Sequence, residues 1–201
     1  MNSRRLILIS GTAFLAGCDK LVWPGKANAE AFKNIDITGA EYARKLDLPD
    51  QNGKLTSLAD FKGKVVVVFF GYTQCPDVCP GTMAELAQIK KTLGKDGERL
   101  QGVFITVDPE RDTTEILKAY MGSFDPSFVA LRGTPEQTTT LAKEFKVFFA
   151  KVPGKTEGSY TVDHTAGSYV FDSAGKVRLF VRYGSGLEPF TADLKTLLSA
   201  A

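Results

Sequence analysis

Cysteine, histidine and net charge are all scarce in this chain of 201 residues. It contains three cysteines and one histidine, so any site built on thiols or imidazoles must draw on very few side chains. Removing residues 1–17 would take away two arginines and no acidic residue, which leaves 23 basic residues against 23 acidic ones. A neutral chain lacks the basic surface that nucleic-acid binding requires. Nucleic acid is therefore not an expected partner.

The chain also lacks an apolar run long enough to cross a membrane. Two arginines precede a mostly apolar stretch at residues 6–15, but a spanning helix needs about 20 such residues. This pattern is typical of a cleaved export signal. The stretch ends in Leu-Ala-Gly-Cys at residues 15–18, which resembles the bacterial lipobox. We therefore predict a lipoprotein signal peptide at residues 1–17 and lipidation of Cys18; the alternative is an ordinary signal with an incidental cysteine.

The sequence after the signal predicts a tether and one domain. Asp19 follows the cysteine and resembles the signal that retains bacterial lipoproteins in the inner membrane, so we expect a lipid anchor in the cytoplasmic membrane, with the protein facing the periplasm. The arginine pair also faintly resembles a twin-arginine signal, which leaves the export route open. Residues 18–34 would form the lipid-anchored tether. Residues 35–201 suffice for one domain with a real core and are too few for two.

Strands and helices alternate along this domain. An almost wholly apolar run at residues 64–70 predicts a strand buried on both faces. Alternation of this kind predicts an α/β fold, in which helices flank a central mixed β-sheet, and residues 35–61 would add an N-terminal β-hairpin. The other expected elements are strands at 103–107 and 129–131, helices at 80–93, 113–121, 135–145 and 189–198, and a hairpin of 169–171 with 177–182.

Two of the three cysteines, Cys75 and Cys79, come shortly after the first buried strand. Two thiols separated by three residues can form a disulfide, ligate a soft metal, or do both in turn. A purely structural bridge would close too small a loop to stabilise the fold much. In thioredoxin-like folds an active dithiol lies at this strand-to-helix junction, so the placement favours that architecture.

The prolines around the pair predict that it is exposed and reactive. Pro76 and Pro80 disfavour a helical conformation at the cysteines that precede them, and Pro80 suits the first helical position, which would place Cys79 at the helix cap. There the free backbone amides and the positive helix end would favour thiolate. We therefore expect both cysteines to be exposed, turn-borne and partly activated. Asp77 either tunes this loop or is an exposed turn residue, and the second role is favoured.

The only histidine, His164, precedes the strand expected at residues 169–171. In thioredoxin-like folds that segment faces the dithiol loop. Two thiolates and one imidazole would complete a three-coordinate site for copper(I), which can also hold copper(II), whereas a closed structural zinc site would need a fourth ligand. Asp163 either orients the imidazole or simply starts the strand.

A further acidic segment, residues 108–112, follows the second central strand. Its position places it near the same edge of the sheet as the dithiol. Asp108 and its neighbours would either recognise a partner and tune the site, or cap the helix that begins near residue 113. The capping role is favoured, because acidic residues stabilise a helix N-terminus without any partner.

Three motifs together resemble the Sco/SenC family, the thioredoxin-fold assembly factors for the copper A centre of cytochrome c oxidase. The resemblance covers about residues 40–200, and the conjunction of motifs is specific where a bare CxxxC is not. Threonine at position 165, where serine is common, is a mild departure. The motifs are Phe70-Gly71-Tyr72-Thr73 with Cys75-Pro76-Asp77-Val78-Cys79-Pro80, the run from Phe104 to Asp112, and Asp163-His164-Thr165.

This resemblance implies that Cys75, Cys79 and His164 are copper ligands in a membrane-anchored copper chaperone, which need not be an enzyme. Its acceptor would be the copper A-bearing subunit of cytochrome c oxidase, with another copper chaperone as donor and a thioredoxin-like protein as reductant. The alternative is a thiol-disulfide oxidoreductase that reduces the oxidase cysteines, with Cys75 and Cys79 as its redox-active pair. Redox sensing is a further alternative.

Overall fold

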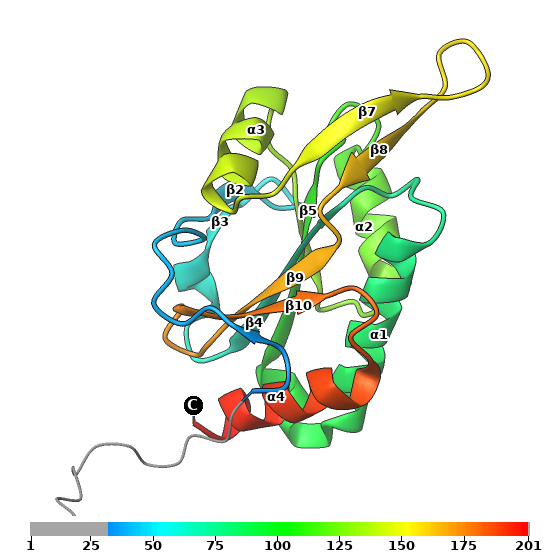
Figure 1. Ribbon diagram of the computed structural model, residues 1–201. Coiled ribbons are helices and arrows are strands. Elements are labelled where there is room, and N and C mark those ends of the chain that lie inside the picture. Colours follow the sequence, from blue (N-terminus) through cyan, green and yellow to red (C-terminus); the bar gives the residue numbers. More distant parts are fainter. Residues whose placement is uncertain (1–31, 201) are drawn as a thin grey trace, which may run out of the picture. The chain divides into compact units, whose positions relative to one another are not determined.

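Six strands form the central sheet of the computed structural model, which describes residues 32–200 (Figure 1). Their order is β1-β10-β9-β4-β5-β6. β4 pairs in parallel with β5, and β5 with β6, whereas β9 is antiparallel to both β4 and β10. The predicted mixed sheet is therefore confirmed. The strands are β1 Ile35–Asp36, β4 Val65–Gly71, β5 Leu100–Thr106, β6 Val129–Leu131, β9 Gly167–Phe171 and β10 Val177–Arg182.

Helices cover both faces of this sheet (Figure 1). On one face, Leu86 of α1 lies over Gly102 and Tyr120 of α2 packs against Phe104. On the other face, the end of α3 brings the ring of Phe145 to 5.1 Å from that of Phe70. This is the predicted thioredoxin-like arrangement. The helices are α1 Val78–Thr92, α2 Thr114–Gly122, α3 Pro135–Glu144 and α4 Leu187–Ser199, with short 3-10 helices η1 Leu58–Phe61 and η2 Gly94–Arg99.

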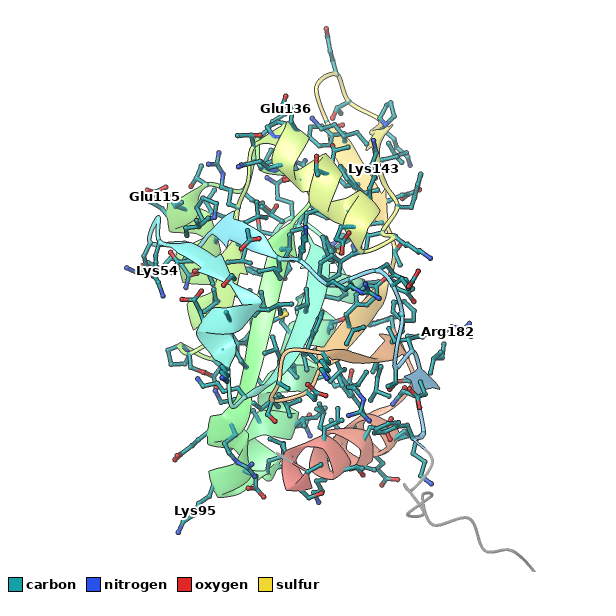
Figure 2. All side chains as sticks on the ribbon, turned by 90° about the vertical axis from the view of Figure 1, so that its left-hand side faces the viewer. Lys54, Lys95, Glu115, Glu136, Lys143 and Arg182 are labelled. Atoms are coloured by element: carbon teal, nitrogen blue, oxygen red, sulfur yellow. The ribbon has the colours of Figure 1, made fainter. Side chains whose placement is uncertain are left out.

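β4 is the centre of the core because it has a strand on each side and helices over both faces. All seven of its residues are buried, as its continuous apolar sequence predicts. Most charged side chains lie on the outside of the domain and carry both signs, in keeping with the neutral composition. Figure 2 labels exposed examples: Lys54, Lys95, Lys143, Arg182, Glu115 and Glu136.

The predicted N-terminal hairpin is present as β2 (Asp47–Pro49) and β3 (Leu55–Ser57), joined by a turn in which Gly53 has a φ of 81°. The prediction missed that the segment before it separates from the hairpin and joins the main sheet, where β1 pairs with β10. A buried carboxylate holds the segment just before β1 in place. Asp193 of α4 accepts hydrogen bonds from the backbone amides of Lys33 and Asn34, both at 2.8 Å.

A second hairpin was not predicted from the sequence. β7 (Phe149–Pro153) pairs with β8 (Tyr160–His164), so that Phe149 lies opposite His164. Only the tip, residues 154–159, lies outside the two strands. Most of the hairpin's residues are exposed or half-buried, with Val162 the exception. The alternation of apolar and polar residues that reveals a strand is absent from β7 and extends over only five residues in β8, so the signal is weak.

The predicted signal peptide, Cys18 and most of the tether lie outside the described residues. Within residues 32–200, no helix is both long and apolar enough to span a membrane.

Candidate metal centre

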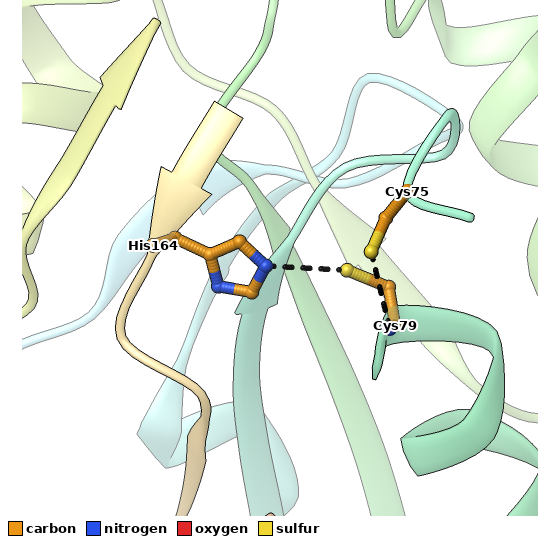
Figure 3. Close-up of side chains that lie close together, drawn as sticks. All are labelled: Cys75, Cys79 and His164. Atoms are coloured by element: carbon orange, nitrogen blue, oxygen red, sulfur yellow. Dashed lines mark hydrogen bonds between the residues drawn. The ribbon is translucent and has the colours of Figure 1, made fainter. Parts of the chain in front are cut away.

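Cys75, Cys79 and His164 converge at the carboxyl end of β4 (Figure 3). Cys75 lies in the loop after β4, Cys79 in the first turn of α1, and His164 at the end of β8. Cys79 Sγ is 3.4 Å from His164 Nε2, and the three ligand atoms all lie within 4.8 Å of one another. Of the residues that the structure describes, these are the only three histidine, cysteine or acidic side chains gathered closely enough to share a metal ion.

The loop between the cysteines is tied to the start of α1. The helix begins at Val78, with Asp77 at the N-cap, and not at Pro80 as predicted. Asp77 is exposed, as expected, and its carbonyl accepts the amide of Gly81. The amide of Cys79 donates to Cys75 Sγ at 3.5 Å. The helix end therefore offers a free N–H to the sulfur of Cys75.

The prediction that both cysteines are exposed and activated is wrong for Cys79. Its side chain is fully buried and belongs to the hydrophobic core, whereas Cys75 is half-buried. Burial raises the pKa of the Cys79 thiol, because a thiolate loses its hydration in an apolar setting. The positive end of the helix does not offset this cost.

Gly71, the last residue of β4, makes room for that sulfur. A Cβ at this position would lie 2.8 Å from Cys79 Sγ and 2.8 Å from the ring of Phe69, closer than atoms in contact can be. The sequence does contain a signal for this role, since a glycine ends an otherwise bulky apolar strand, and glycine in a strand often marks a close approach.

Two aromatic rings enclose the imidazole of His164. The rings of Phe69 and Tyr72 meet it edge-on, with centroids at 5.8 and 6.0 Å. The carbonyl of Thr165 lies 3.2 Å from Nδ1, and since a carbonyl can only accept, the proton sits on Nδ1 and leaves the Nε2 lone pair facing the thiols. Burial lowers the pKa of His164, which favours the neutral ring that metals bind.

Asp163 does not orient this ring. It is exposed on β8, opposite Ala150, and the group that meets Nδ1 is the Thr165 carbonyl. The alternative in which Asp163 is simply a strand residue agrees with the structure.

The helix-capping role predicted for residues 108–112 is wrong. The N-cap of α2 is Thr113, whose hydroxyl accepts the amide of Ile116. Asp108 is buried, pairs with Arg111 and accepts the hydroxyl of Tyr160 at 2.9 Å. Asp108 and Asp112 turn inward because polar partners from other segments, which cannot be identified from local sequence, meet them there, whereas Glu110 is exposed.

Asp112 holds the beginning of the dithiol loop, the segment 72–77 between β4 and α1. Its carboxylate accepts the hydroxyls of Thr73 and Thr106, both at 2.6 Å, and the amide of Thr73 at 3.1 Å. Burial raises the pKa of this carboxyl, with a further contribution from the nearby charge of Asp108, although the three hydrogen bonds work in the opposite direction.

The raised pKa of Asp112 should therefore contribute to the free energy of unfolding, and this contribution should fall as pH rises. The folded state holds the proton more tightly than the unfolded chain, so the contribution is fully present below the ordinary value of 3.8 and is lost as pH rises through the raised folded pKa. We expect the stability advantage of wild type over Asp112→Asn to shrink over that range in urea unfolding at a series of pH values.

Asp60→Asn is the matched control, because its slope should have the opposite sign. Hydrogen bonds from Lys54 and Ser57 lower the pKa of Asp60 to about 2, so its stabilising term is lost as pH falls through that value. If the wild-type advantage over Asp112→Asn were constant or grew with pH, the assignment of Asp112 would be wrong.

The donor set suits a soft metal ion. Thiolates and a neutral imidazole match copper(I) in donor type, and three donors leave an open side for a further ligand. The same two thiols are free and close enough for redox exchange after a small movement. Geometry alone therefore supports both metal transfer and thiol chemistry.

Comparison with known proteins gives consistent similarities. The sequence model of the SCO1/SenC family matches residues 36–199. The SCO2-like protein of Rickettsia felis is 38% identical over 144 residues, which are 71% of this chain and 70% of the relative. The copper-bound structure of Bradyrhizobium japonicum ScoI is 40% identical and aligns with a TM-score of 0.69 over 76% of this chain and 97% of its own.

A third similarity is to a lipoprotein of known structure. The structure of a SCO1/SenC family lipoprotein from Bacillus anthracis is 28% identical to this chain and aligns with a TM-score of 0.62, covering 78% of this chain and 97% of the relative.

Proposed function

Because the chain belongs to the SCO1/SenC family, we propose that it binds copper through Cys75, Cys79 and His164 and delivers it to the copper A-bearing subunit of cytochrome c oxidase. The observation that carries the proposal is the convergence of these three side chains within 4.8 Å. Copper is the cargo here, because a chaperone must release what it binds.

Transfer would proceed by ligand exchange. A three-coordinate ion leaves space for a thiolate of the acceptor, and each new copper–sulfur bond replaces one to this protein. Cys75 lies in the loop and is more exposed than Cys79. We therefore propose that the acceptor thiolate approaches the copper ion from the side of Cys75. The released Cys79 thiolate regains a proton readily, because burial raises its pKa.

We place the protein in the cytoplasmic membrane, anchored by lipid on Cys18 and facing the periplasm. The lipobox-like tetrad at residues 15–18 supports this location, as does the lipoprotein relative. Another copper chaperone would supply the ion, and a thioredoxin-like protein would keep the two thiols reduced, since a disulfide cannot ligate copper.

Anaerobic copper(I) titration against a chromophoric chelator tests the binding. Mutating the residues that support a metal's ligands usually weakens metal binding by roughly 10–100-fold. Because His164→Ala and Cys75→Ser remove ligands themselves, we expect each to weaken copper binding by more than that. Asp77→Asn, in the same loop but exposed, should bind as wild type does. Unchanged affinity in both ligand variants would refute the proposal.

Thiol-disulfide exchange is the second candidate, because the same pair could pass two electrons to a disulfide of the acceptor and become a disulfide itself. That reaction needs both thiols but not the imidazole. If His164→Ala reduces the oxidised acceptor at the wild-type rate and still supports oxidase assembly, reduction is the main function. Loss of assembly with intact reduction points to copper delivery.

A further inference from the structure

Arg111 connects three segments that lie far apart in the sequence. It stands in the loop between β5 and α2, and its Nε donates to the buried carboxylate of Asp108. Its Nη1 donates to the carbonyl of Tyr160 at 2.9 Å and to Oε1 of Gln74 at 3.2 Å. One guanidinium therefore joins the β5 loop, the first residue of β8 and the dithiol loop.

Stacking adds a second set of contacts. The guanidinium lies 3.6 Å from the ring centroid of Tyr160 and 5.7 Å from that of Tyr72. The ring of Tyr72 in turn meets the imidazole of His164. The hydroxyl of Tyr160 donates a hydrogen bond to Asp108, which also pairs with Arg111. Arg111 thus lies between the fully buried carboxylate of Asp108 and two aromatic rings, of which that of Tyr72 also meets the imidazole of His164.

The hairpin that carries His164 needs such a support. β7 and β8 form a two-stranded sheet of their own, with no strand pairing to the central sheet, and an isolated two-stranded hairpin is at best marginally stable in water. Its other charged link, from Lys151 to Glu110, joins two exposed side chains and is screened by solvent. The Arg111 contacts with Asp108 and with the Tyr160 carbonyl are half-buried, so they restrain the hairpin more strongly, whereas the contact with Gln74 is exposed.

We propose that Arg111 is a positioning residue: it holds β8 so that the imidazole of His164 stays within reach of both thiols. The inference rests on the proposed function, because it assumes that His164 is a copper ligand. Lysine cannot replace arginine here, since it keeps the charge beside Asp108 but lacks the planar fork that reaches Tyr160 and Gln74 at once.

The test combines copper affinity with a measurement on the metal-free protein. Arg111→Lys should weaken copper(I) binding by about tenfold in the wild-type background and have no further effect in His164→Ala. In metal-free protein it should speed amide hydrogen exchange across β8, while exchange in β9 and β10 stays unchanged.

Arg99→Lys is a close control. Arg99 also pairs with an acidic residue three positions earlier, Asp96, and also donates to a distant carbonyl, that of Leu198, but it does not contact the site. It should alter neither copper affinity nor exchange in β8.

Three outcomes would overturn the role of Arg111. The first is unchanged exchange in β8, and the second is unchanged copper affinity in Arg111→Lys. The third applies when His164→Ala itself binds copper weakly: Arg111→Lys then lowers copper affinity equally in the wild-type and His164→Ala backgrounds, so Arg111 does not act through His164. This outcome leaves the proposed function standing. If His164→Ala binds copper like wild type, the proposed function loses its histidine ligand and Arg111 loses its role with it.

Discussion

Cys79→Ser is expected to remove tight copper binding and to destabilise the fold, whereas Cys75→Ser should remove only the copper. The difference follows from burial. Cys79 packs in the core next to Gly71 at the end of β4, while Cys75 is half-buried in the loop. A buried cysteine behaves as a small apolar residue, but a serine hydroxyl there needs a hydrogen-bond partner, and lacking one costs about 1–3 kcal/mol.

Urea unfolding of the metal-free variants, together with anaerobic copper(I) titration, checks this expectation. Cys79→Ala is the matched variant: it removes the ligand without placing a hydroxyl in the core, so it should lose copper as completely as Cys79→Ser while unfolding at a higher urea concentration. Equal stability of the serine variants at positions 75 and 79 would show that the burial of Cys79 has no energetic consequence.

Gly71→Ala is expected to disturb the fold and the metal site together. The new methyl group would lie 2.8 Å from Cys79 Sγ and from the ring of Phe69, and 2.9 Å from the ring of Phe104. Overpacking of this kind typically costs about 1–3 kcal/mol. The sulfur can relieve the contact only by moving away from its place beside His164, so copper affinity should fall by about tenfold or more.

Gly102→Ala separates these two effects. A Cβ at Gly102, on the neighbouring strand β5, would lie 2.8 Å from the ring of Phe128 and 3.0 Å from Leu86, so it overpacks the core without touching a thiol. It should lower stability by a similar amount and leave copper affinity unchanged. If it weakened copper binding as much as Gly71→Ala does, the effect would belong to general destabilisation and not to the displaced sulfur.

The three metal-ligand candidates were predictable because their residue types are rare and their local context is informative. Cys75 and Cys79 follow a continuous apolar strand, and His164 is the only histidine of the chain. The central strands and the helices were predictable for a similar reason, since burial on one or two faces leaves a periodic pattern in the sequence. The β7–β8 hairpin has few buried residues and therefore leaves only a weak pattern, five alternating residues in β8 and none in β7.

The sequence by itself determined which donor atoms exist, where they lie along the chain, and that the fold is an α/β sheet with the dithiol at a strand end. Only the tertiary structure decided that Cys79 is buried, that a carbonyl and not Asp163 meets the imidazole, and that Asp108 and Asp112 turn inward. The physical reason is that solvation and hydrogen bonding depend on neighbours from distant segments. Arg111, for example, reaches partners 37 and 49 positions away, and no local pattern records such contacts.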